Sequence, residues 1–103
     1  MSQLWVSAGI EVLEGKDIQR ARDALSALAV ATLQEPGNIK FKILQQIDKP
    51  ECFTLWECWI NENALQQHYA ATHTQDYFAQ EWTQLVYIER LQEADIMGKG
   101  VEA

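Results

Sequence analysis

The chain has 103 residues and a net charge of -7, with 15 acidic side chains against 8 basic ones. A phosphate backbone or an anionic lipid surface repels such a chain, and no cluster of Lys or Arg offsets this locally. We therefore expect no nucleic-acid partner and no membrane partner. The 48% of hydrophobic residues can form the core of one small domain over residues 1–103, and the surplus favours association with a second copy.

The sequence also indicates where the protein works. No apolar run approaches the roughly 20 residues of a membrane helix. The first residues have no basic region and lead directly into a predicted strand, so we expect no signal peptide. Cys52 and Cys58 lie on one predicted strand, too far apart for a disulfide. Free thiols are typical of the cytoplasm, which is the expected location.

The first half of the chain predicts a strand, a helix and a second strand. Residues 4–13 are rich in strand-forming side chains, and residues 16–34 show the periodicity of an amphipathic helix that Pro36 and Gly37 end. Apolar and polar side chains then alternate from Ile39 to Asp48. The predicted inner face of the helix carries Ile18, Ala21, Leu25, Leu28 and Thr32.

The second half predicts a third strand, two short helices and a last strand. Residues 48–51 form a turn, and residues 52–60 return as a strand that is apolar on both faces. Asn61 is a suitable N-cap for the first short helix, and residues 72–75 match a capping box that opens the second, which runs to Glu81. Residues 82–91 form the last strand, and residues 93–103 form a tail that is mobile or contacts a partner subunit.

This order of elements predicts an α+β, ferredoxin-like β-α-β-β-α-β fold, with an antiparallel sheet whose helices cover one face. We expect Trp56 to point toward the helices. Phe41, Phe53 and Trp59 would then lie on the free face, which a second copy would bury in a homodimer.

One stretch resembles a known family. From Glu35 to Phe78 the chain carries Glu-Pro-Gly, then the segment Leu-Trp-Glu-Cys-Trp, then His68 and His73 on consecutive helices. This ordered combination resembles the antibiotic biosynthesis monooxygenase (ABM) family, which includes cofactor-free quinol oxygenases. The resemblance implies a single ABM-like domain and a dimeric α/β barrel.

Several kinds of site lack support in the sequence. Glycine-rich nucleotide and phosphate motifs, the serine-hydrolase elbow and a pair of cysteines two residues apart are all missing. A metal site would need carboxylates from elsewhere to join the two histidines. We therefore predict no cofactor and no metal.

The histidines are the candidate catalytic residues. His68 follows Leu65 by three residues and should point toward the sheet. His73 lies in the first helical turn, where the helix dipole disfavours imidazolium, so it could act as a general base. Both could equally be structural, with His68 a hydrogen-bonded core residue. The family resemblance, in which the matching histidines commonly line the ligand cavity, adds weight to the catalytic reading.

Aromatic side chains form the candidate substrate-binding surface. A flat aromatic ligand would stack well against them, although each could also be ordinary core. Glu57 should be paired or face an interface, and a structural hydrogen bond across the dimer is the preferred interpretation over catalysis. The candidate binding residues are Trp56, Tyr69, Tyr77, Phe78 and Trp82.

Departures from the family pattern guide the functional prediction. Haem-degrading members use an asparagine on the first strand and a late helical histidine, and both are missing here. The two-histidine pattern instead looks like the quinol monooxygenase and autoinducer-2-degrading branches. We predict an enzyme, a cofactor-independent monooxygenase that uses molecular oxygen on a small quinol or polyphenol. The alternatives are an isomerase or degrading enzyme for a small phosphorylated signal ketone, and a non-catalytic dimer that is either ligand-binding or purely structural.

Overall fold

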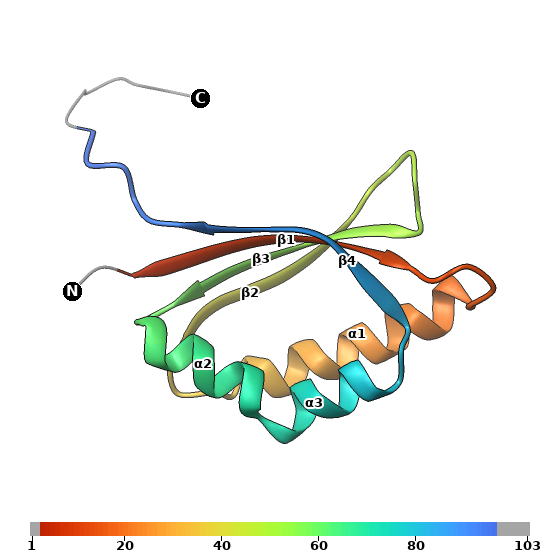
Figure 1. The fold of residues 1–103 in the computed structure, drawn as a ribbon, viewed down its shortest axis with the longest axis horizontal. Coiled ribbons are helices and arrows are strands. Elements are labelled where there is room, and N and C mark those ends of the chain that lie inside the picture. Colours follow the sequence, from red (N-terminus) through yellow and green to blue (C-terminus); the bar gives the residue numbers. More distant parts are fainter. Residues whose placement is uncertain (1–2, 97–103) are drawn as a thin grey trace.

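The computed structural model describes residues 3–96. One four-stranded antiparallel sheet has its helices on a single face (Figure 1), which confirms the predicted ferredoxin-like α+β fold. The strand order is β2-β3-β1-β4. No helix in the described range is long and apolar enough to span a membrane. The elements are β1 (Leu4–Val12), α1 (Ile18–Thr32), β2 (Asn38–Gln45), β3 (Cys52–Trp59), α2 (Glu62–Ala70), α3 (Thr72–Ala79) and β4 (Thr83–Leu91).

The sequence predicts the N-terminal caps of two helices, and the structure confirms one of them. Asn61 caps α2, and its side-chain oxygen accepts a hydrogen bond from the Ala64 N–H at 2.8 Å. The capping box predicted for residues 72–75 is wrong, because the N-cap of α3 is Ala71, which has no side-chain acceptor. The chain turns so sharply after α2 that Thr72 is already helical, and Gln75 donates to the Tyr69 carbonyl instead.

The two faces of the sheet are inverted relative to the prediction. The register places Phe41 opposite Glu57, and Phe53 and Trp59 lie on that same side. This side faces the helices, and Phe41, Phe53 and Trp59 are only 5%, 4% and 0% exposed. The alternation itself was predicted correctly. A strand that is apolar on both faces does not reveal which face the helices cover.

Trp56 therefore lies on the open face rather than under the helices, which corrects the predicted orientation. Its ring is stacked obliquely on that of Trp5, with centroids 5.2 Å apart. Tyr87 of β4 pairs with Gly9 on the same open face, and its hydroxyl is 3.1 Å from the Ser7 hydroxyl. A side chain at Gly9 would overlap the Tyr87 ring. The open face thus keeps its own apolar surface, built from different residues.

A tight turn joins α1 to β2 and orients Glu35. The Asn38 N–H donates to the Glu35 carbonyl at 3.0 Å, with Pro36 and Gly37 between them. Gly37 is buried against α2, where a Cβ would overlap the Ala64 side chain. Ala64 lies one helical turn before His68 in α2, so this close approach places Glu35 beside His68.

The last strand, β4, forms the edge of the sheet beside β1 and contains a bulge. Gly9 pairs with Tyr87 and Ile10 with Leu85, so Val86 is the additional residue. As a consequence, Leu85 and Ile88 both point toward the helices although they are three residues apart. Leu85 is 60% exposed and Ile88 45%.

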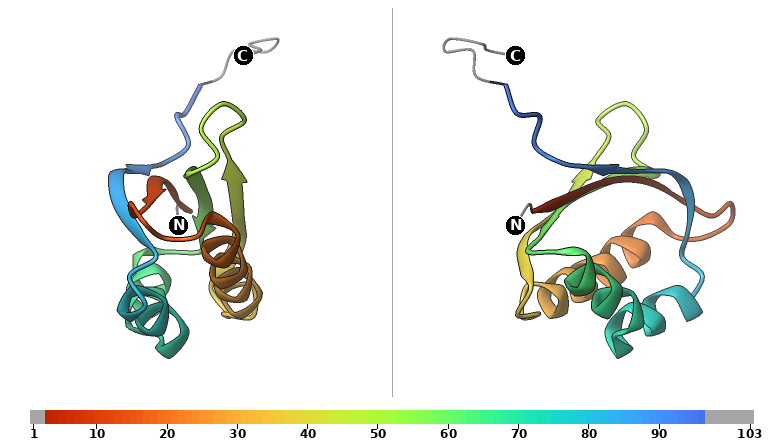
Figure 2. Two further views of the ribbon diagram at one scale, coloured as in Figure 1. Left: turned by 90° about the vertical axis from the view of Figure 1, so that its right-hand side faces the viewer. Right: turned by 60° about the vertical axis from the view of Figure 1, so that its left-hand side comes forward.

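The views in Figure 2 show α1 and the α2–α3 pair as two groups under the sheet, with β4 on the side of α2 and α3. The second strand is shorter than predicted, because β2 ends at Gln45. Ile47 is 95% exposed in the loop that projects from the β2–β3 hairpin.

Candidate active site

A cavity of about 460 Å³ lies between the sheet and the helices. This volume is within the range of about 300–1,000 Å³ that is usual for small-molecule sites. Apolar and aromatic side chains dominate its wall, and no Lys or Arg is among the described residues that line it. The lining consists of Ala8, Ile10, Leu28, Phe41, Leu55, Glu57, His68, Tyr69, Thr74, Tyr77, Phe78, Thr83, Leu85 and Ile88.

One carboxylate oxygen holds both histidines. Glu35 Oε2 is 2.7 Å from His68 Nδ1 and 2.6 Å from His73 Nε2. The side chains of Glu35 and His68 are 13% and 5% exposed, and that of His73 is 28% exposed. Because water is largely excluded, these charge-assisted hydrogen bonds are strong and fix both rings.

The contacts with Glu35 also select the tautomers. A carboxylate only accepts hydrogen bonds, so neutral His68 must carry its proton on Nδ1 and neutral His73 on Nε2. The Nε2 atom of His68 is then an unprotonated acceptor. It has no partner among residues 3–96, and Thr32 Oγ1 is the one fully buried side-chain nitrogen or oxygen there without a partner. His68 Nε2 is therefore not sealed inside the protein. Because His68 lines the main cavity, that cavity is the open space that Nε2 can reach.

The surroundings of His68 favour its neutral form. Its ring packs against that of Trp59, with centroids 4.7 Å apart, and against Phe41 at 5.7 Å. Burial lowers the pKa of His68, which outweighs the opposing effect of Glu35. At neutral pH the ring can therefore accept a proton through Nε2.

His73 lies on the other side of Glu35. It is not among the described residues that line the main cavity, and it borders a separate groove between α1 and α3, with Leu28 and Asp76. It is in the first turn of α3, as the sequence predicts. The structure thus brings both histidines to one carboxylate but places only His68 in the cavity wall.

Glu57 is the second acidic group of the site. It projects from β3 into the helix side of the sheet, and its Oε1 accepts a hydrogen bond from Trp59 Nε1 at 2.9 Å. Burial raises the pKa of Glu57 to about 7, helped by the charge of Glu35 and opposed by the Trp59 hydrogen bond. Within one chain this carboxyl group faces a cavity, whereas the sequence predicted a hydrogen bond across the dimer.

The predicted aromatic surface is assembled in part. Tyr69, Tyr77 and Phe78 line the cavity, and the Tyr77 hydroxyl is 2.7 Å from that of Thr83. Trp56 does not, because it lies on the open face of the sheet. Trp82 does not either, since it precedes β4 and packs near Lys16, whose Nζ is 5.4 Å from the ring centroid.

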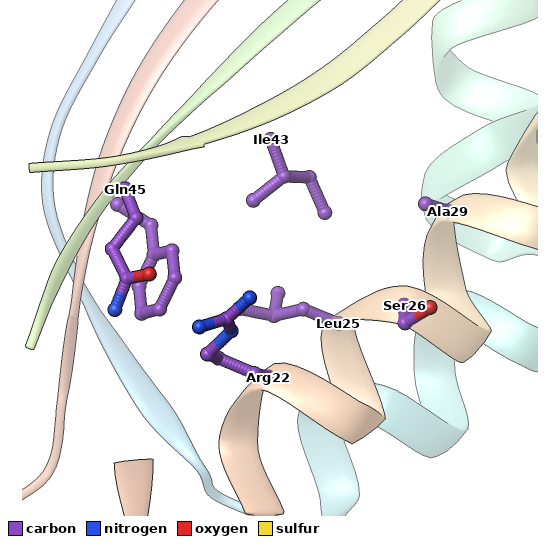
Figure 3. Close-up of a pocket in the computed structure, with 7 residues that line it drawn as sticks. Arg22, Leu25, Ser26, Ala29, Ile43 and Gln45 are labelled. Carbon is purple, nitrogen blue, oxygen red and sulfur yellow. The ribbon is translucent and has the colours of Figure 1, made fainter. Parts of the chain in front are cut away.

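A second hollow lies between α1 and the edge strand β2. Its volume is about 270 Å³. Figure 3 shows Arg22 from α1 and Gln45 from β2 reaching over it, beside Leu25 and Ile43. Arg22 is exposed, and neither a histidine nor a carboxylate is among the described residues that line the hollow.

Glu35, His68 and His73 together offer the ligand types of a metal site. The carboxylate that such a site needs is thus supplied by Glu35, a role that the sequence pattern alone did not predict. Their atoms are at hydrogen-bond distances of 2.7 and 2.6 Å. Ligands of one ion at bond lengths of about 2.0–2.1 Å lie further apart than this. We therefore interpret the three residues as a hydrogen-bonded group.

Glu35 is the site residue that sequence reasoning missed. Its signal was present, because Pro36 and Gly37 end the predicted helix directly after it and Glu-Pro-Gly is part of the family pattern. A helix end that is followed by two strands and a helix carrying histidine can place its side chain against that second helix. Only the close approach of Gly37 to Ala64 shows that it does.

The chain matches known proteins over most of its length. YjcS from Bacillus subtilis (strain 168), an uncharacterized protein, is 27% identical over 88 residues, covering 85% of this chain and 84% of YjcS. A solved structure of protein YjcS has a TM-score of 0.83 at 26% identity, covering 90% of this chain and 100% of that one. The crystal structure of SnoaB, a cofactor-independent oxygenase from Streptomyces nogalater, has a TM-score of 0.81. At 10% identity, over 96% of this chain and 100% of SnoaB, that likeness concerns the fold.

A family model gives the identification. The model of the antibiotic biosynthesis monooxygenase family matches residues 4–80, which include every helix and strand except β4. The chain therefore belongs to the antibiotic biosynthesis monooxygenase family.

Proposed function

We propose that this protein is a cofactor-independent monooxygenase of the quinol type, with His68 as its general base. The supporting observation is a buried imidazole in the wall of an apolar cavity, held by Glu35 through Nδ1, while Nε2 has no partner among residues 3–96. His73 acts through Glu35 as a positioning residue. The aromatic wall of Tyr69, Tyr77 and Phe78 receives the ring of the substrate.

The proposed reaction needs no reductant other than the substrate. His68 Nε2 takes the hydroxyl proton of the substrate, and the resulting anion is electron-rich enough to transfer electrons to O₂. A carbon–oxygen bond forms, and His68 returns its proton to the peroxide anion to give a hydroperoxide. Neutral His68 then removes the remaining hydrogen at that carbon as a proton, and cleavage of the O–O bond leaves a carbonyl and hydroxide. One oxygen atom stays in the product, and the other leaves as water when the proton from carbon reaches the hydroxide.

Two alternatives fit the cavity less well. A phosphorylated ketone needs a cation near its phosphate, and no Lys or Arg is among the described residues that line the cavity. The Glu35 carboxylate behind His68 also opposes an anionic ligand. A purely structural dimer would have its core filled with side chains, whereas the structure leaves about 460 Å³ open beside His68.

We also propose that the working form is a homodimer in which open sheet faces pack together, as in a dimeric α/β barrel. The support is the apolar surface of Trp5, Trp56 and Tyr87, of which Tyr87 is 42% exposed. Phe41, Phe53 and Trp59 no longer support this proposal, because the helices already cover them.

Oxygen consumption tests the proposed activity. The purified protein, without added cofactor, is supplied with a panel of quinols, naphthols and catechols. We expect uptake of oxygen with at least one of them and an absorption spectrum without flavin or haem bands. A His68→Asn variant serves as the control for uncatalysed oxidation of the substrate. Uptake that equals this control for every compound would refute the proposal.

A further inference from the structure

Glu57 is a carboxyl group in the middle of an apolar sheet face. Across the strands it is paired with Val6 of β1 and Phe41 of β2, which are 0% and 5% exposed. Along β3 its neighbours on the same face are Leu55 and Trp59. An ionised carboxylate is strongly disfavoured among such side chains, so its presence there needs a reason.

One of its two oxygens is unused by the protein. Oε1 accepts the hydrogen bond from Trp59 Nε1. Oε2 has no hydrogen-bond partner between residues 3 and 96. In that range Thr32 Oγ1 is the sole fully buried side-chain oxygen or nitrogen without a partner. Glu57 Oε2, which also has no partner, is therefore not fully buried. Glu57 is among the residues that line the main cavity, so that cavity is the open space that its Oε2 can reach.

We propose that Glu57 binds the substrate as a neutral carboxylic acid, with Oε2 donating a hydrogen bond to an acceptor oxygen of the bound molecule. The cavity then presents an acceptor, His68 Nε2, and a donor, Glu57 Oε2, on an otherwise apolar wall. This pair selects a ring compound that carries both a hydroxyl group and a carbonyl, such as a hydroxyaryl ketone. The inference rests on the proposed function only in taking this cavity as the substrate site.

The groups around Glu57 keep its proton in place. Glu35 approaches from the turn after α1, His68 and Tyr69 from α2, and Tyr77 from α3. None of these side chains is a permanent cation. Burial lowers the pKa of His68, which favours its uncharged form. Burial raises the pKa of Glu57 to about 7; the Trp59 hydrogen bond opposes this and the charge of Glu35 adds to it. A neutral acid is a good donor, whereas an ionised Glu57 would repel a carbonyl oxygen.

Calorimetric binding of two matched ligands tests the inference without any turnover. α-Tetralone is a bicyclic ketone, and tetralin has the same ring system without the oxygen. For the wild-type protein we expect α-tetralone to bind about three- to tenfold more tightly at about pH 6 than at about pH 8, the effect of one hydrogen bond. Tetralin should bind equally at both values.

Two variants separate Glu57 from other titrating groups. Glu57→Gln keeps a donor at every pH, so it should retain the preference for the ketone and lose the pH dependence. Glu57→Leu should lose the preference for the ketone at both pH values. Circular dichroism confirms that each variant is folded. Even if Glu57→Leu does not fold, the wild type and Glu57→Gln decide the question.

Three results would overturn the inference. These are equal pH dependence for both ligands, a pH dependence that persists in Glu57→Gln, and no binding of either ligand at about pH 6. The proposed oxygenase activity is tested independently of this inference, because a protein can bind α-tetralone as expected and still consume no oxygen.

Discussion

Glu35 determines what each histidine can do. A base that is hydrogen-bonded to a third group keeps one tautomer and one orientation, which is the arrangement found in many nucleophile and base pairs. Glu35 Oε2 provides this for His68 and His73 at once, through contacts of 2.7 and 2.6 Å. The two histidines nevertheless differ, because one faces the cavity and the other borders a groove near the surface.

Amide substitutions can separate these two roles. His68→Asn keeps a donor at the position of Nδ1 and removes the base at Nε2, so we expect turnover to fall by about 10²- to 10⁴-fold. His73→Gln keeps a donor at the position of Nε2, so we expect a loss of about tenfold or less. Oxygen uptake and melting temperature are measured for both variants. Turnover of His68→Asn at the wild-type rate would show that His68 is structural.

The raised pKa of Glu57 predicts a pH-dependent effect on stability. Between the ordinary pKa of a glutamate, about 4.3, and the folded value of about 7, the folded chain holds a proton that the unfolded chain has lost. The free energy of unfolding therefore falls as pH rises through this window. The loss is complete above about pH 7.

Glu57→Gln should remove this loss. We expect its melting temperature to exceed that of the wild type at about pH 8 by at least about 4 °C, which corresponds to roughly 1 kcal/mol for a domain of this size. At about pH 4 the two proteins should melt within about a degree of each other. Thermal unfolding followed by circular dichroism makes the comparison. An equal difference at both pH values would mean that Glu57 does not titrate as inferred.

Single residues also show how far the sequence could predict the site. Helical periodicity predicts the inward orientation of His68. The predicted binding residues Tyr69, Tyr77 and Phe78 line the same cavity. Trp56 could not be placed, because strand periodicity gives two faces without identifying the covered one. Glu35 could not be placed because its position depends on packing between segments that are distant in the sequence.

At the level of elements, the turn before β2 connects packing to the site. Gly37 lies against Ala64 of α2, and the Gly37 carbonyl accepts a hydrogen bond from the Ile60 N–H at 3.0 Å. These contacts fix the distance between the turn and the helix. They therefore also fix the distance between Glu35 and His68.

Enlarging Gly37 should disturb the site through this contact. Gly37→Ala places a methyl group on the Ala64 side chain, and overpacking of this kind typically costs about 1–3 kcal/mol. We expect lower stability and slower oxygen uptake. Adding Ala64→Gly frees the space, so the double variant should recover activity despite the cost of a helical glycine. If the double variant is as slow as the single one, the contact does not control the position of Glu35.

The order and bounds of the elements followed well from the sequence, for identifiable reasons. Helical periodicity and Pro36-Gly37 define α1, and Asn61 marks the start of α2. The capping box failed because the chain reverses at Ala71, which has no side chain to cap α3, and the Gln75 side chain donates to the Tyr69 carbonyl of the preceding helix. The end of β2 was placed too late, because Ile47 continues the alternation in a loop.

For the whole molecule, the open sheet face predicts association. Burying aromatic side chains such as Trp5 and Trp56 is worth several kcal/mol at about 25 cal/mol per Å². We expect sedimentation velocity to show a dimer at micromolar concentration. Trp56→Glu should shift it to a monomer, whereas Ile47→Glu, on the exposed hairpin loop, should leave it unchanged. A wild-type protein that sediments as a monomer would contradict the proposed dimer.

The extra residue in β4 has a consequence for how this fold can change. Removing Val86 would leave Leu85 and Ile88 two positions apart, which is the ordinary spacing of side chains on one face of a strand. The same side chains would still form the wall, but the strand would lose the bend that a bulge introduces. Insertion or deletion of one residue here therefore alters the curvature of the cavity while preserving its chemistry. Evolution or protein engineering could use that length change to adapt the size of the ligand that is accepted, independently of the acid and base groups.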